Sequence, residues 1–202
     1  MKAYRVTTLG SVPLVSQIAA PEPKNGEVLL KIDACGLNFA DLLMAKGTYQ
    51  DTPEVPFTLG LEVCGTVLAT GEGVEHPKVG TRVAVFGGSG GLAEQGVFPA
   101  NKCIEVPANM PSETAAGFQV GYGTSHLALT RRANLKKNET LLVLGASGGV
   151  GLTAIEVGKV IGATVIAVAR GEEKLQIAKN AGADHVIDSD DEKLIERIKE
   201  LG

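Results

Sequence analysis

The chain has 202 residues, of which 44% are apolar and 21% charged, and its formal net charge is -4. At ~150 residues per domain, this length allows one large domain or two small ones, and the apolar fraction is typical of a packed protein rather than a disordered one. The mild acidity is spread along the chain, so nothing favours nucleic acid as a partner.

The apolar runs and the cysteines bear on where the protein works. The best apolar run, residues 160–169, is interrupted by Gly162 and Thr164 and is shorter than the ~20 residues of a membrane span. Residues 1–6 alternate like a strand and lack the apolar stretch of a signal peptide. Three widely spaced cysteines form no Cys-x-x-Cys pair. We therefore expect a soluble protein of the reducing cytoplasm, with no membrane partner.

Up to about residue 120, glycines and prolines cut the chain into short β-rich runs. These runs cover residues 27–34, 62–70, 82–86 and 102–106. Period-2 runs separated by turn signals predict a compact antiparallel barrel or sandwich. A short helix is expected over residues 39–46, with Asn38 as a favoured N-cap and Gly47 as its stop.

From residue 140 the pattern changes to alternating strands and helices. Strands are predicted over 140–144, 164–169 and 185–188, and helices over 149–161, 172–181 and 190–201. This alternation is typical of parallel strands with right-handed crossovers, here half of a doubly wound sheet. An apolar segment over 115–130 is expected to join the two parts as a helix, which gives domains 1–120 and 121–202.

The first strand of the second part runs into a glycine-rich turn, residues 145–151. Backbone N–H groups and a helix N-terminus can there approach a pyrophosphate, although Ala146 replaces the usual first glycine. The alternative is that the glycines only tighten the turn, but the order of strand, loop, helix and second strand favours dinucleotide binding. The residues expected to hold the pyrophosphate are Ser147, Gly148, Gly149, Val150 and Gly151.

Coenzyme preference is read at the end of the second strand, where an acidic residue would bind the ribose 2'-hydroxyl. Ala169 stands there, followed by Arg170 and, a turn later, Lys174. Loss of the carboxylate and gain of Arg170 favour the 2'-phosphate of NADP(H). The alternative is that both cations are only solvated surface charges.

A hydrolase is a further alternative, because residues 87–91 and 145–149 both match Gly-x-Ser-x-Gly. A nucleophile at Ser147 would need an acid and then a histidine downstream. The only downstream histidine, His185, directly follows Asp184 on a short predicted strand. Ser89 has no helix pattern after it, so hydrolysis is disfavoured at both serines.

Several motifs in order along the chain resemble those of the medium-chain dehydrogenase/reductase superfamily. They are Cys35-Gly36-Leu37-Asn38-Phe39-Ala40-Asp41, Gly60-Leu61-Glu62-Val63-Cys64-Gly65, Val79-Gly80-Thr81-Arg82-Val83, Gly121-Tyr122-Gly123-Thr124, the glycine turn and Ala181-Gly182-Ala183-Asp184. The resemblance is to the zinc-independent quinone oxidoreductase group. It implies a GroES-like β-barrel domain followed by a Rossmann domain, of which the first three strands are present.

The resemblance also bears on metal and mechanism. The positions of the superfamily's catalytic zinc ligands correspond to Asn38, Leu61 and Ala116, none of them a good zinc ligand, so no metal is expected. The implied chemistry is hydride transfer from NADPH to a quinone or conjugated enone. Asn38 and Tyr49 are expected to act on the acceptor, and Asn38 and Thr124 beside the nicotinamide.

Each of these residue roles has a structural alternative. The chain as a whole also has alternative functions. Asn38 could cap the helix over 39–46, Asp41 could be a structural acceptor, and Tyr49 could be ordinary packing. A non-catalytic NADPH-binding protein and an enoyl-thioester reductase fit the same residues. Because the expected sheet stops after three strands, we predict a shortened form of a longer reductase, weakly active at most. Members of the group are usually homodimers, and the state of this chain is left open.

Overall fold

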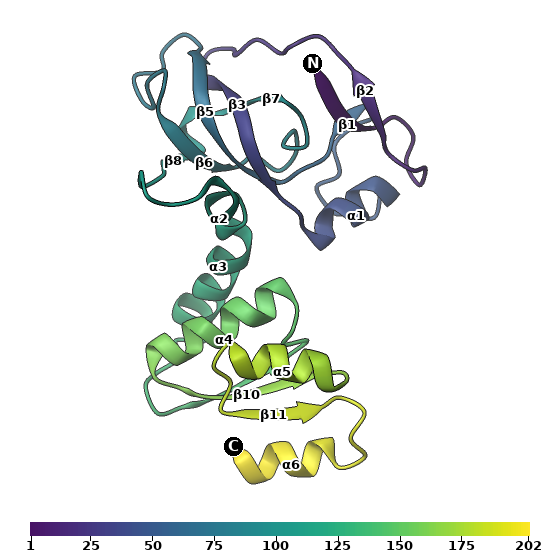
Figure 1. Cartoon of the computed structure of the whole chain (residues 1–202), viewed down its shortest axis with the longest axis vertical. Coiled ribbons are helices and arrows are strands. Elements are labelled where there is room, and N and C mark those ends of the chain that lie inside the picture. Colours follow the sequence, from purple (N-terminus) through teal and green to yellow (C-terminus); the bar gives the residue numbers. More distant parts are fainter. The chain divides into compact units, whose positions relative to one another are not determined.

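The computed structural model describes residues 1–202, which form two compact units, Met1–Gln119 and Val120–Gly202. Figure 1 shows the chain from its N-terminal strand to its C-terminal helix. No helix combines the length and apolar character that crossing a bilayer requires.

The first unit is built on two antiparallel sheets. One has the strand order β2-β1-β4, with β1 at Lys2–Val6, β2 at Leu14–Gln17 and β4 at Phe57–Thr58. The other has the order β7-β3-β5-β6-β8, with β3 at Glu27–Gly36, β5 at Glu62–Thr70, β6 at Arg82–Phe86, β7 at Gln95–Pro99 and β8 at Cys103–Glu105. Three short helices accompany them: α1 (Phe39–Lys46), a 3-10 turn (Ala100–Lys102) and α2 (Ser112–Ala116).

The antiparallel character of this unit agrees with the sequence pattern, but the sheets do not close into a barrel. They are linked by a few hydrogen bonds, including Tyr4 N–H to Leu92 O (2.8 Å) and Leu59 N–H to Tyr4 O (3.1 Å). The strand expected over 102–106 is shorter, because Ala100–Lys102 turns as a 3-10 helix before β8 begins.

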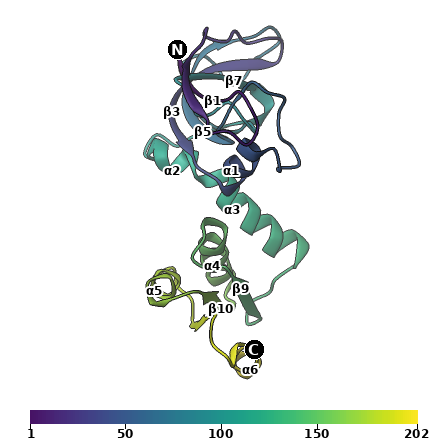
Figure 2. The same cartoon turned by 90° about the vertical axis from the view of Figure 1, so that its right-hand side faces the viewer.

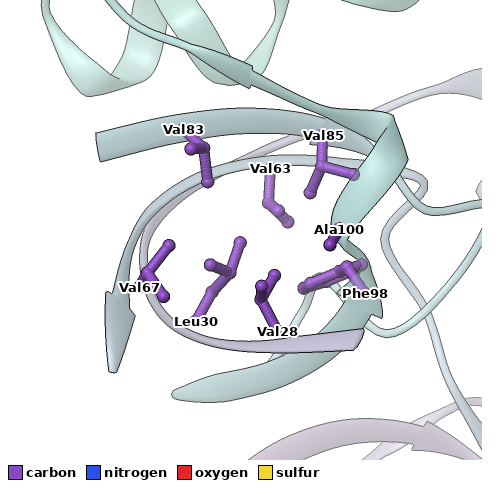
Figure 3. Close-up of a cluster of buried hydrophobic side chains, with 8 residues drawn as sticks. All are labelled: Val28, Leu30, Val63, Val67, Val83, Val85, Phe98 and Ala100. Carbon is purple, nitrogen blue, oxygen red and sulfur yellow. The ribbon is translucent and has the colours of Figure 1, made fainter. Parts of the chain in front are cut away.

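The core of the first unit lies on the concave side of the five-stranded sheet. Figure 3 shows eight side chains converging there from the strands and the adjoining turn: Val28, Leu30, Val63, Val67, Val83, Val85, Phe98 and Ala100. The ring of Phe98 packs where Gly87 and Gly96 carry no side chain, since a Cβ on either would come within 2.8 Å of it. Alternation along the strands therefore sorts these residues inward.

The second unit contains one parallel sheet of order β11-β10-β9, with β9 at Thr140–Leu144, β10 at Thr164–Ala169 and β11 at His185–Asp188. Helix α4 (Gly149–Ile161) joins β9 to β10, α5 (Glu172–Asn180) joins β10 to β11, and α6 (Leu194–Leu201) follows β11. The three predicted strands are confirmed with their bounds, and the parallel order agrees with the alternating pattern.

Helices cover both faces of this sheet, as Figure 2 shows for α4 and α5 against α6. On the α4 and α5 face the core includes Val143, Ile155 and Val165. On the other face Ile166, Val168 and Ile187 pack against apolar residues of α6. Strand β10 is buried on both sides, which explains its continuous apolar sequence.

Two helix predictions need correction. The segment over 115–130 is not one helix: α2 ends at Ala116 with Gly117 as its C-cap, α3 spans Phe118–His126, and a π-helical stretch follows over Leu127–Arg132. Glycine has a low helix propensity, which suits the break. The last helix begins at Leu194 rather than 190, because the Asp191 carboxylate accepts the Lys193 N–H (2.9 Å) and holds a turn there.

Two glycines at the start of α4 should respond to an added methyl group to different degrees. A Cβ at Gly151 would lie 2.5 Å from the Gly145 carbonyl oxygen, whereas one at Gly149 would meet nothing within 4 Å. Gly151→Ala should cost about 1–3 kcal/mol of unfolding free energy, and Gly149→Ala less than about 0.5 kcal/mol. Urea unfolding followed by circular dichroism measures both. Equal stability of the two variants would contradict this account of the turn.

Candidate functional site

The carboxyl ends of the three parallel strands meet at one edge of the sheet. Leu144 pairs with Val168, and Ala169 with Asp188. Two hydrogen bonds continue this alignment into the loops: Ala146 N–H to Val168 O (3.0 Å) and Ser189 N–H to Ala169 O (2.9 Å). The glycine turn and the segments after β10 and β11 therefore form one continuous edge, the position at which open α/β sheets bind ligands.

Helix α4 begins at this edge with its first N–H groups uncapped. Its N-cap is Gly148, which offers no capping side chain. The N–H groups of Gly149, Val150 and Gly151 have no partner within the helix, as for any first turn. Gly148, Gly149 and Val150 are exposed, Ser147 is half-buried, and the space in front of Gly149 is open. These features form a cradle that would accept a diphosphate at the positive end of the helix.

A buried hydroxyl pair fixes the first turn of α4 against α3. Ser125 and Thr153 are both buried, and their hydroxyl oxygens lie 2.7 Å apart. Thr153 Oγ1 donates to Gly121 O (3.0 Å), and Ser125 Oγ donates to Val150 O (3.0 Å). A carbonyl at the start of α4 is thus tied to its neighbour helix. Sequence reasoning did not single out this pair, because its partners are far apart along the chain.

Helix α3 carries two further residues that bear on the site, Tyr122 and Thr124. The Tyr122 hydroxyl donates a short hydrogen bond to the Glu156 carboxylate on α4, and this bond, with the negative charge of Glu156, raises the pKa of Tyr122. Thr124, expected beside the nicotinamide, is exposed on α3. Its hydroxyl makes no protein hydrogen bond, which leaves it accessible to a ligand.

The segments after β10 and β11 carry opposing charges. Arg170 Nε lies 3.1 Å from Asp190 Oδ1. Asp188 accepts the N–H groups of Gly171 and Asp190, each at 3.0 Å. Lys174 is exposed in the first turn of α5 without an ion pair. The sequence prediction counted the two cations and missed both aspartates. The available signal was that Asp188 ends the neighbouring parallel strand.

In the first unit, a buried polar cluster surrounds Asn38. Asn38 and Asp41 form the capping box of α1, with the Asn38 N–H 2.9 Å from Asp41 Oδ2. Asp41 Oδ1 also accepts the Gly60 N–H at 2.9 Å, which ties α1 to the chain entering β5. Asn38 Nδ2 donates to Glu62 Oε1 at 3.0 Å. Asn38 thus stands at the N-cap of α1, and its side-chain amide is oriented by a glutamate that is 2% exposed.

Burial and charge in this cluster raise the pKa values of Asp41 and of the neighbouring Cys35 thiol. Burial raises the pKa of Asp41, although the N–H groups of Asn38 and Gly60 oppose the shift. Burial, followed by the charges of Asp41 and Glu62, raises the pKa of the Cys35 thiol to about 12. Cys35 is therefore a protonated thiol at neutral pH, which is the form that is a poor nucleophile.

Asn38 and Tyr49 line two separate recesses. Asn38 and Asp41 border a recess of about 500 Å³ with a mostly apolar wall. Tyr49 borders another of about 330 Å³ together with Leu61, Phe86 and Lys102. Tyr49 also packs against the cluster around Met44 and Phe57, so it is a packing residue with one edge in a recess. The structure brings Asn38 together with Asp41 and Glu62, but not with Tyr49.

The residues do not fit a catalytic zinc ion. Leu61 and Ala116 offer no side-chain donor atom, and Asn38 offers a neutral amide rather than a thiolate, an imidazole or a carboxylate. No group of three or more His, Cys, Asp or Glu side chains is placed to hold a metal. Such a set would be needed for the usual N and S coordination of zinc.

Two family models match the chain, each within one of the two units. The model described as "Alcohol dehydrogenase GroES-like domain" covers residues 24–108. The model described as "Zinc-binding dehydrogenase" covers residues 149–202. The word zinc in this description belongs to the name of the family.

The chain is also similar to quinone oxidoreductases and related proteins, both in sequence and in structure. Mouse quinone oxidoreductase-like protein 2 is 38% identical over 191 residues, which is 94% of this chain and 55% of the relative. Guanaco quinone oxidoreductase is 36% identical over 98% of the chain and 62% of the relative. The structure of Escherichia coli quinone oxidoreductase complexed with NADPH matches with a TM-score of 0.91 at 32% identity, over 100% of this chain and 62% of that one.

The chain belongs to the medium-chain dehydrogenase/reductase superfamily, with a GroES-like domain followed by a Rossmann-like one. Within the superfamily it falls in the quinone oxidoreductase group. It spans between half and two thirds of the length of these relatives.

The Asp41 carboxylate should be a principal stabilising contact of the first unit. Asp41→Ala leaves the buried Gly60 N–H and the Asn38 N–H without their acceptor, which should cost about 2–4 kcal/mol of unfolding free energy. Asp51→Ala, at an exposed position, is the control. Urea unfolding measures both variants, and a loss no larger than that of the control would contradict the role of Asp41.

The native thiols should be slow to alkylate at pH 8. The pKa of Cys35 is about 12 and burial raises that of Cys103 to about 11, so the thiolate fraction of Cys35 is about one in ten thousand. Iodoacetamide labelling followed by mass spectrometry should accelerate as the pH rises toward 11, and urea should make all three cysteines reactive at pH 8. Rapid labelling of Cys35 in the folded chain at pH 8 would contradict the shifted pKa.

Proposed function

We propose that this chain carries the coenzyme site and part of the acceptor site of an NADPH-dependent reductase. The observation that carries the proposal is the uncapped start of α4, where Gly149 faces open space at the carboxyl edge of the sheet. The guanaco and E. coli relatives are named quinone oxidoreductases, and the E. coli protein was solved with NADPH. A quinone or conjugated enone is the acceptor class that we propose.

The second unit supplies the groups that would hold the coenzyme. The N–H groups of Gly149, Val150 and Gly151 would donate to the diphosphate, with Ser147 and Gly148 shaping the turn around it. Arg170 and Lys174 would bind the 2'-phosphate. The hydroxyl of Thr124 would contact the nicotinamide end. When NADPH is bound, its nicotinamide supplies the hydride.

The first unit supplies the groups that would face the acceptor. Asn38 Nδ2 keeps one N–H after its bond to Glu62 Oε1, and this N–H would donate to a carbonyl oxygen of the acceptor. The apolar wall of the adjoining recess, which includes Leu37, Phe39 and Leu42, suits an aromatic ring. Tyr49 would act at the edge of the second recess, by stacking or through its hydroxyl. The proposed chemistry uses no zinc.

We also propose that the protein works in the reducing cytoplasm. Cys35, Cys64 and Cys103 are free thiols, and such a compartment keeps thiols reduced. A homodimer is the expected state of the complete protein, and small molecules rather than macromolecules are its expected ligands.

The cradle at Gly149 gives the sharpest test of the proposal. Gly149→Val places a branched side chain in the open space where the diphosphate would lie, so the dissociation constant for NADPH should rise by roughly tenfold or more. Val160→Ala, on the last turn of the same helix and 88% exposed, should leave binding unchanged. Calorimetric titration measures both, with thermal melting to establish folding. Undiminished binding to folded Gly149→Val would refute the assigned diphosphate site.

A further inference from the structure

An ion pair occupies the place at which a 2'-phosphate would be recognised. Arg170 directly follows β10, and Asp190 lies two residues beyond the end of β11. Their Nε and Oδ1 atoms are 3.1 Å apart, with 73% of the Arg170 side chain and 62% of the Asp190 side chain exposed. An exposed single contact of this kind adds little stability. We therefore consider its effect on ligand binding at this edge of the sheet.

The loop after β11 is shaped so that Asp190 faces Arg170. Asp188 Oδ2 accepts the Gly171 N–H and Asp188 Oδ1 accepts the Asp190 N–H. The first of these bonds joins the end of β11 to Gly171, the N-cap of α5, and the second holds the loop that carries Asp190. The charge of Asp188 is therefore balanced by backbone N–H groups. The carboxylate of Asp190, in contrast, accepts a hydrogen bond from Arg170 alone.

Arg170 is only partly used by this contact. Its Nε is engaged by Asp190, whereas the two terminal NH₂ groups have no protein partner. Those groups form the fork that binds phosphate in a bidentate manner. A phosphate on the fork would carry up to two negative charges and would stand close to the Asp190 carboxylate. Because the phosphate and the carboxylate are both negative, they would repel each other at close range even in water.

We propose that Asp190 is a specificity-determining residue, which competes with the 2'-phosphate for Arg170 and so limits the preference of the chain for NADPH over NADH. This inference rests on the proposed coenzyme site. NADH carries no 2'-phosphate, so its binding should be nearly independent of the Asp190 charge. Glu172 and Glu173, in the first turn of α5, add negative charge close to Arg170 in the sequence.

The test is a calorimetric titration of the full chain with NADPH and with NADH. Asp190→Asn removes the charge but keeps a polar side chain suited to a turn, so the variant should fold. The dissociation constant for NADPH should fall by about threefold to tenfold, while that for NADH stays within about twofold. Adding Arg170→Met to Asp190→Asn should abolish the gain for NADPH.

Glu200→Gln is the matched control, because it removes the same charge elsewhere. Glu200 borders a recess with Asp184 and His185 at the amino end of β11, the opposite edge of the sheet. It should leave the ratio of the two dissociation constants unchanged. An unchanged ratio in Asp190→Asn, or weaker NADPH binding there, would overturn the inference while leaving the proposed function intact. Failure of the unmodified chain to bind either coenzyme would overturn both.

Discussion

The absence of a side chain at Gly151 is the constraint on which the candidate coenzyme site depends. It lets the first turn of α4 approach the Gly145 carbonyl more closely than any residue with a Cβ could. The helix consequently starts after a turn of only four residues beyond β9, with its unpaired N–H groups at the carboxyl edge of the sheet. The bond from Ser125 to the Val150 carbonyl then fixes that turn from the side of α3. Packing and ligand recognition therefore depend on the same few backbone atoms.

In the first unit, the main constraint is that two buried carboxylates must be satisfied by hydrogen bonds. Asp41 and Glu62 are 6% and 2% exposed, and buried charges are costly unless they are hydrogen-bonded. Asn38 serves both, because its backbone N–H donates to Asp41 and its side-chain amide to Glu62. Gly36 leaves the space that the Glu62 side chain occupies, since a Cβ there would lie 2.6 Å from Oε1. The orientation of the Asn38 amide is thus a consequence of how the carboxylates are satisfied.

The sequence allowed different parts of this architecture to be predicted to different degrees. The strands β9, β10 and β11 were predicted with their bounds, because strands of a covered parallel sheet are short apolar runs between helices. Helix α1 was equally clear, with Asn38 before it and Gly47 after it. The helix expected from residue 190 starts at Leu194, because the Asp191 carboxylate stabilises a turn instead of a first helical turn. For the first unit the pattern predicted an antiparallel barrel or sandwich. The structure has two antiparallel sheets without a closed barrel, because closure depends on long-range pairing that local pattern does not reveal.

Site residues that depend on tertiary contacts could not be read from local pattern. Arg170 was recognised by its place after a strand, whereas its partner Asp190 becomes a neighbour only when β10 and β11 pair. The bond from Asn38 to Glu62 likewise joins residues from separate motifs. The grouping of Asn38 with Tyr49 followed from family resemblance, and the two side chains line different recesses. Their joint action on one acceptor is therefore a proposal and not a feature of the geometry.

The central claim is that a diphosphate binds to the backbone at the start of α4. Amide resonances report on this directly, so the most direct measurement is a titration of the isotopically labelled chain with NADPH, followed by nuclear magnetic resonance. The account predicts the largest shifts at Gly148, Gly149, Val150 and Gly151, with a second set at Arg170. Shifts confined to the first unit, or none at the glycine turn under saturating NADPH, would contradict it.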